Sequence, residues 1–219
     1  MPGVSAGVLL FRRVAASVPP ATAGGASGLE VLLVHPGGPY WAKKDAGAWS
    51  IPKGEVEPDE LDPPQAAPAE PWRRPPKVKP RLRAVAADLL AVAKREFREE
   101  TGFDPDTLAA PGAAYVPLGG VKQRGHKIVY VWALEGDCDA SLVTSEPFEM
   151  EWPPHSGKEA SFPEVDRASW FGIAAAREKL LAAQHRFLDD LAAFAGVGLS
   201  AGSGAPAGPA AEPGRSPGS

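Results

Sequence analysis

The chain has 219 residues, of which 44% are hydrophobic and 23% are charged, the composition of an ordinary globular protein. Its formal net charge of −4 gives no general bias toward nucleic acid or anionic membrane, so neither is expected as a partner. The single Cys138 excludes an internal disulfide, which fits the cytoplasm, and the short apolar run before Arg12 is expected to be neither a membrane span nor a signal peptide.

Two strands are predicted near the N-terminus, at Ser5–Arg13 and Leu29–His35. The second contains three consecutive large apolar residues, which favours a central strand that is covered on both faces. A long loop, 36–47, follows it and contains Tyr40 and Trp41. These aromatic side chains are candidates to stack on a nucleobase, with closure of the core edge as the alternative.

A short third strand is predicted at Trp49–Ile51, leading into Pro52, Lys53 and Gly54. Glycine at position 54 permits a close approach that a side chain would forbid. Lys53 is placed to contact a phosphate, although a solvated lysine is an equal alternative. The segment 61–83 that follows is rich in proline and, in its second half, in arginine and lysine. We predict that it is an irregular insertion, either a solvated loop or a basic flap.

The clearest predicted helix is Ala84–Glu100, because it is rich in strong helix formers and lacks Gly and Pro, and because Gly102 supplies a stop. An apolar stripe is expected along it at Ala86, Leu90, Ala93 and Phe97. Beside that stripe, within an arc of about 100°, three carboxylates project together from Glu96, Glu99 and Glu100.

Clustered carboxylates repel one another, and each resists ionisation unless a cation neutralises the group. A hard divalent cation such as Mg²⁺ prefers oxygen ligands of this kind. Arg95 lies four residues before Glu99, the spacing at which a salt bridge orients a carboxylate. The alternative for this segment is a solvated charged helix face.

Further along the chain, a hairpin is predicted from strands at Tyr115–Val121 and His126–Leu134. Its turn region offers cationic and amide donors that are candidates for binding phosphate, at Lys122, Gln123, Arg124 and Lys127. We predict an irregular region at Ser145–Phe162, a short strand or turn at Glu164–Phe171 and one long helix at Ile173–Phe194. The Gly- and Pro-rich segment 196–219 is predicted to be a disordered tail behind one domain, 1–195.

Two stretches together resemble the Nudix box, the signature of the Nudix hydrolases. Gly54 followed after five residues by Glu60 matches its first half, and Arg95–Phe103 matches its second half, Arg-Glu-x-x-Glu-Glu-x-Gly, at every defined position. The departure is the spacer, because 34 residues, 61 to 94, stand where the family has far fewer. That departure puts the placement of Glu60 in doubt.

The resemblance implies an α+β fold, a Nudix-type α/β/α sandwich around a mixed β-sheet. It also implies hydrolysis of a phosphoanhydride bond in a nucleoside diphosphate-linked compound, with Mg²⁺ or Mn²⁺ held by the three helix carboxylates and by the carbonyl of Gly54. The Pro-Lys-Gly-Glu loop and the predicted hairpin resemble those of members that act on nucleoside triphosphates or dinucleoside polyphosphates.

Catalytic roles are expected for Arg95, Glu99 and Glu100, and substrate contacts for Trp41, Lys53, Gln123 and Lys127. The general base is left open among Glu100, Glu146, Glu149 and Glu164, and base recognition among Tyr40, Trp41 and Trp152. Two other functions remain on the same scaffold: a non-catalytic nucleotide-sensing module, and an RNA 5′-end pyrophosphohydrolase that uses the basic insertion.

Overall fold

The computed structural model describes residues 3–14, 28–57, 81–123, 125 and 127–196. Several predictions fall outside these residues: the position of Glu60, most of the insertion 61–83, the residues Arg124 and His126, and the tail beyond Gly196. None of the described helices is long and apolar enough to span a membrane.

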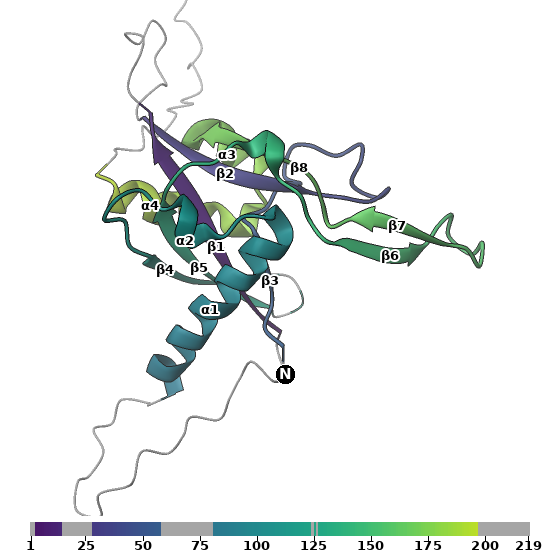
Figure 1. Cartoon of the computed structure of the whole chain (residues 1–219), viewed down its shortest axis with the longest axis horizontal. Helices are drawn as coiled ribbons and strands as arrows, with labels where there is room; N and C mark the ends of the chain where they lie inside the picture. The colour runs from purple at the N-terminus through teal and green to yellow at the C-terminus, as the bar shows by residue number, and fades with distance from the viewer. Residues whose placement is uncertain (1–2, 15–27, 58–80, 124, 126, 197–219) are drawn as a thin grey trace, which may run out of the picture.

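A mixed sheet forms the centre of the protein (Figure 1). β1 lies in the middle, pairs in parallel with β5, and shares its other edge between β2 and β3, both antiparallel. The two outer strands, β4 and β8, pair antiparallel with β5 and β2. Within the described residues the sheet has six strands: β1 (Val4–Arg13), β2 (Leu29–Pro36), β3 (Lys53–Glu55), β4 (Val116–Lys122), β5 (Ile128–Glu135) and β8 (Val165–Gly172).

Helices cover both faces of this sheet, and the alternation of side chains along β1 shows why. Val8 and Leu10 point into one apolar cluster with α1, whereas Leu9 and Phe11 point into a second cluster with α3 and α4. The predicted α+β sandwich around a mixed sheet is therefore confirmed. The α-helices are α1 (Arg81–Thr101), α2 (Pro105–Leu108), α3 (Ile173–Lys179) and α4 (His185–Phe194), with a short 3₁₀ turn at Ala140–Leu142.

Helix α1 begins at Arg81, so the predicted insertion boundary at residue 83 is three residues too late. Residues 81–83, Arg-Leu-Arg, are all good helix formers, and the preceding proline is tolerated at a helix start. The buried stripe is Leu89, Val92, Ala93 and Phe97; Leu90, predicted to belong to it, is only half-buried.

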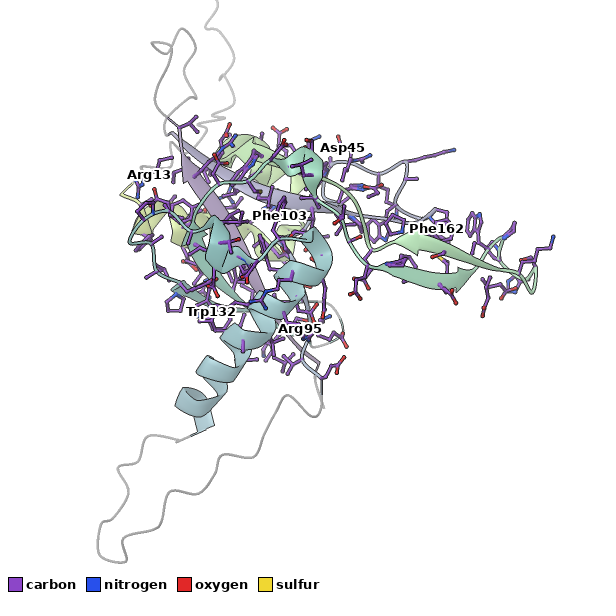
Figure 2. The ribbon with its side chains drawn as sticks, in the orientation of Figure 1. Arg13, Asp45, Arg95, Phe103, Trp132 and Phe162 are labelled. Carbon is purple, nitrogen blue, oxygen red and sulfur yellow. The ribbon has the colours of Figure 1, made fainter. Side chains whose placement is uncertain are left out.

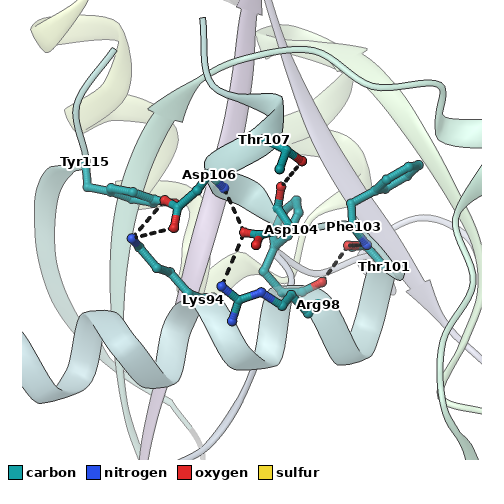
Figure 3. A network of polar contacts seen from close by, with 9 residues as sticks. Lys94, Arg98, Thr101, Phe103, Asp104, Asp106, Thr107 and Tyr115 are labelled. Atoms are coloured by element: carbon teal, nitrogen blue, oxygen red, sulfur yellow. Dashed lines mark hydrogen bonds and ion pairs between the residues drawn. The ribbon is translucent and has the colours of Figure 1, made fainter. Parts of the chain in front are cut away.

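Polar contacts fix the C-terminal half of α1 against α2 (Figure 3). Asp104 caps α2 by accepting the N–H of Asp106 and also pairs with Arg98. Asp106 accepts the Tyr115 hydroxyl and pairs with Lys94. Because these contacts lie on the side of α1 away from its acids, they limit rotation of the helix about its axis.

The predicted strand at Trp49–Ile51 is wrong by several residues. This segment makes only isolated bridges, from Ser50 to β2 and from Trp49 to Leu180, and the strand itself is β3. Pro52 has no N–H for a ladder, but its carbonyl accepts the N–H of Val8 at 3.1 Å. Segment 49–55 therefore bridges to β2 before Pro52 and pairs with β1, as strand β3, only after Pro52.

The single long helix predicted at Ile173–Phe194 is wrong because the helix breaks at Leu180. That residue takes an extended backbone conformation and is only 1% exposed. The Leu181 N–H then donates to the Trp49 carbonyl, and a 3₁₀ turn, Ala182–Gln184, restarts the chain into α4. Burial of Leu180 and its backbone pairing outweigh helix propensity here.

The irregular region predicted at Ser145–Phe162 is also wrong, because it contains a β-hairpin of β6 (Pro147–Glu151) and β7 (Glu159–Pro163). The hairpin projects from the body next to β8 (Figure 1). Half-buried residues on both strands alternate with exposed ones, as in any two-faced hairpin. The many glutamates and prolines conceal this period of two in the sequence.

Candidate active site

The backbone of β3 packs directly on Glu96 of α1. A methyl group built on Gly54 would lie 1.6 Å from Glu96 Oε2, so only glycine fits there. Glu96 is 8% exposed and faces this backbone from the helix. The two halves of the motif therefore meet in space, although 34 residues separate them in the sequence.

The other two helix acids are held by separate partners. The Lys53 N–H donates to Glu100 Oε2 at 2.8 Å, which joins β3 to α1 a second time. The Arg95 guanidinium bridges Glu99, at 2.6 Å, and Glu96, at 2.8 Å, as predicted from the spacing of Arg95 and Glu99. It also donates to the Glu55 carbonyl at 3.3 Å, so it lies between α1 and β3 (Figure 2).

Two further acids reach this site from the base of the β6–β7 hairpin. The Glu146 N–H donates to the Glu99 carbonyl at 3.1 Å, and the Glu164 N–H donates to the Glu146 carbonyl at 3.0 Å. The first bond caps a carbonyl in the last turn of α1, and the second ties Glu164 to Glu146, so both acids lie beside the end of the helix. Glu149, in contrast, lies on an exposed position of β6.

Together these elements line an open hollow of about 500 Å³, called the acidic hollow below. Its walls come from β3 and the residues after it, from α1, and from the two stems of the hairpin. They consist of Gly54, Glu55, Val56, Glu57, Arg95, Glu96, Glu99, Glu146 and Glu164.

Burial and mutual repulsion disfavour the charged forms of these acids. Burial raises the pKa of Glu96 to about 7; Arg95 opposes the rise, and Glu99 and Glu164 add to it. Burial likewise raises the pKa of Glu100 to about 7, although the charge of Lys53 and its backbone N–H act to lower that pKa. Burial, with Glu146 and Glu99, raises the pKa of Glu164. A cation placed among these carboxyl groups would favour their charged forms.

The donor set fits a hard divalent cation, since it consists of carboxylate oxygens and of main-chain carbonyls close to them. Among the described residues, however, no three His, Cys, Asp or Glu side chains already converge into a coordination group. Arg95 currently spans Glu96 and Glu99. An ion would therefore draw the acids together by changes in side-chain rotamer.

The structure places the predicted substrate residues at different distances from the hollow. Lys53 lies in β3, and Lys127 pairs with Glu55 of the hollow wall at 2.7 Å. Gln123 is half-buried beside Lys127, and its Nε2 atom is buried without a hydrogen-bond partner among the described residues. Trp41 does not line the hollow; it lies in the loop after β2, with the Lys44 ammonium 4.3 Å from its ring centroid.

These raised pKa values predict how stability depends on pH when no metal is present. A carboxyl whose pKa rises from 4.5 to about 7 on folding binds more protons in the folded state, so the free energy of unfolding falls as pH rises from about 5 to 8. The loss is on the order of 3 kcal/mol for each carboxyl. Urea denaturation in EDTA across this range measures it.

Glu96→Gln and Glu100→Gln remove a titrating group each and should flatten this slope. Acids with lowered pKa values, such as Asp45 and Asp106, lose their stabilising charge at lower pH and do not interfere. An unfolding free energy that is constant from pH 5 to 8 would show that these two acids are well solvated.

Comparisons with known proteins add a similarity of fold. No family model and no curated protein sequence match the chain. Solved structures do: it is similar to an Ap4A hydrolase of C. elegans, with 17% identity, a TM-score of 0.46, and coverage of 89% of this chain and 98% of that one. It is also similar to a MutT protein of Methanosarcina mazei Go1, with 16% identity, a TM-score of 0.44, and coverage of 89% of this chain and 96% of that one.

A third similar structure is the Nudix domain of Shewanella oneidensis NrtR complexed with ADP-ribose, with 14% identity, a TM-score of 0.43, and coverage of 89% of each chain. At these identities the resemblance concerns the fold.

Proposed function

We propose that this protein is a metal-dependent hydrolase that cleaves a phosphoanhydride bond in a nucleoside diphosphate-linked compound, a nucleoside triphosphate or a dinucleoside polyphosphate. The contact of Gly54 with Glu96 carries the proposal. A long insertion between two halves of a motif would leave them unrelated unless the fold reunited them, and their packing supports one working site.

The ion in this proposal is Mg²⁺ or Mn²⁺, with Glu96, Glu99, Glu100 and the Gly54 carbonyl as its ligands. When bound, it supplies charge neutralisation of the polyphosphate and activation of the attacking water. The chain's own contribution is orientation. Arg95 pairs with both Glu99 and Glu96, and the Lys53 N–H holds Glu100 against β3, so the three acids are kept near the site, although an ion still requires changes in their rotamers.

The proton of the attacking water passes to a carboxylate near the hollow. Glu100, Glu146 and Glu164 are suitable acceptors because they lie beside the other acids, whereas the exposed Glu149 does not line the hollow. Lys53 of β3 and Lys127, which pairs with Glu55 of the hollow wall, are the candidates to contact substrate phosphates, with Gln123 beside Lys127 as a further candidate.

The reaction is tested by measuring phosphate and nucleotide products from a panel that contains ATP, diadenosine tetraphosphate, ADP-ribose and 5′-triphosphorylated RNA. We expect turnover of one of the first two in Mg²⁺ or Mn²⁺ and none in EDTA. Failure to hydrolyse any pyrophosphate compound would refute the enzyme, and nucleotide binding without turnover would favour the sensing module instead.

A further inference from the structure

The β6–β7 hairpin connects the acidic hollow to an aromatic pair, the exposed Tyr40 and the half-buried Trp152. Its two stems begin at Glu146 and Glu164, which line the hollow. At its far end Trp152 meets Tyr40 of the loop after β2, with ring centroids 5.5 Å apart and planes at 84°. Six residues of extended chain, at about 3.3 Å each, put Trp152 on the order of 20 Å from Glu146.

The loop and the hairpin run outward from the hollow together. The Gly37 N–H donates to the Glu164 carbonyl at 2.8 Å, so the loop starts at the stem of the hairpin. Next, Phe148 and Phe162 pack over Gly38, where an added methyl would lie 3.2 Å from the Phe148 ring. Phe162 is labelled on this hairpin in Figure 2.

This inner contact already joins the hairpin to the loop, so the outer pair is not needed for that purpose. Tyr40 is 56% exposed, which is unusual for a large ring whose role is packing. In an edge-to-face pair one ring contributes only its edge and keeps both of its faces free. Because Tyr40 is exposed, this edge-to-face pair offers a ring face on which a planar ligand can stack.

Lysines lie near the aromatic pair, together with the exposed Glu151 and Glu159, which face each other across the end of the hairpin. Lys43 and Lys44 are exposed on the loop, and the exposed Lys158 accepts the Trp152 N–H at its carbonyl. A ligand that runs from the hollow to the rings would thus pass from the acids, where a bound metal would neutralise its phosphates, to lysine side chains that attract phosphate directly.

We infer that Tyr40 and Trp152 form an outer subsite for a nucleobase at the far end of a two-ended polyphosphate. The inference rests on the proposed function, and it selects dinucleoside polyphosphates over nucleoside triphosphates. The base of a mononucleotide cleaved in the hollow stays close to the acids. A second nucleoside, joined through several phosphates, extends far enough to stack on the pair.

The test compares diadenosine tetraphosphate with ATP in Mg²⁺. For Tyr40→Ala and Trp152→Ala we expect KM for diadenosine tetraphosphate to rise about tenfold more than KM for ATP, with kcat changing less than KM. Tyr40→Phe and Trp152→Phe keep a stacking ring and should therefore keep most of the affinity for diadenosine tetraphosphate. Phe194→Ala, which removes an aromatic side chain that is 53% exposed outside this subsite, is the matched control.

Equal changes for the two substrates, or no change for either, would overturn the subsite. If no compound is hydrolysed, the proposed reaction fails, but calorimetric titration with diadenosine tetraphosphate still tests the subsite. Weaker binding to both alanine variants than to the unchanged chain supports it, and equal affinities refute it.

Discussion

Replacing Glu100 by Gln is expected to lower the hydrolytic rate by at least about a hundredfold while the fold survives. The amide keeps an oxygen that accepts the Lys53 N–H, so the join between α1 and β3 remains. What disappears is the charge, which serves as a metal ligand or as the proton acceptor. Because burial raises the pKa of this carboxyl, the neutral amide should also increase the unfolding free energy at pH 8.

Glu99→Gln should lose activity to a similar extent, since it removes one of the two carboxylates that Arg95 bridges. Glu149→Gln is the matched control, because Glu149 is exposed on β6 and does not line the hollow. Initial rates with saturating substrate and metal give the comparison. Activity retained in both Glu99→Gln and Glu100→Gln would remove these residues from the site.

Replacing Gly54 by Ala is expected to disable the site without adding or removing any charge. The new methyl would overlap the Glu96 carboxyl, 1.6 Å from Oε2, so β3 or Glu96 must shift by an ångström or more. Misplacement on this scale costs on the order of a hundredfold in rate. We also expect a lower melting temperature, because the strand is held between β1 and α1.

Gly172→Ala is the matched control for that substitution. Gly172 has no neighbouring atoms within 4 Å of an added methyl and has an ordinary negative φ of −60°. It should leave both rate and melting temperature nearly unchanged. Wild-type activity in Gly54→Ala would mean that the contact between β3 and Glu96 has no role in the reaction.

The sequence was sufficient to locate α1 and the side of it that carries the acids. Helix periodicity depends on local residue order, and the pairing of Arg95 with Glu99 follows from spacing alone. The strands β1, β2, β4 and β5 were also predicted within two residues at each end, because their apolar runs are bounded by clear loop signals.

The acids contributed by the hairpin could not be selected in this way. Glu146 and Glu164 are ordinary glutamates in a segment dense with glutamate and proline, and the distinction between them and Glu149 is tertiary. Backbone bonds from α1 to the hairpin stems decide which of these acids line the hollow. The break at Leu180 is likewise caused by a distant partner, Trp49, which no local pattern reveals.

The central claim is that Glu96, Glu99 and Glu100 together hold a divalent cation beside Gly54. Titration with Mn²⁺ at pH 8, followed by the electron paramagnetic resonance signal of free Mn²⁺, tests it most directly. The account predicts saturable binding that weakens at least tenfold in Glu99→Gln and in Glu100→Gln and is unchanged in Glu149→Gln. Equal Mn²⁺ affinity in all four proteins would contradict it.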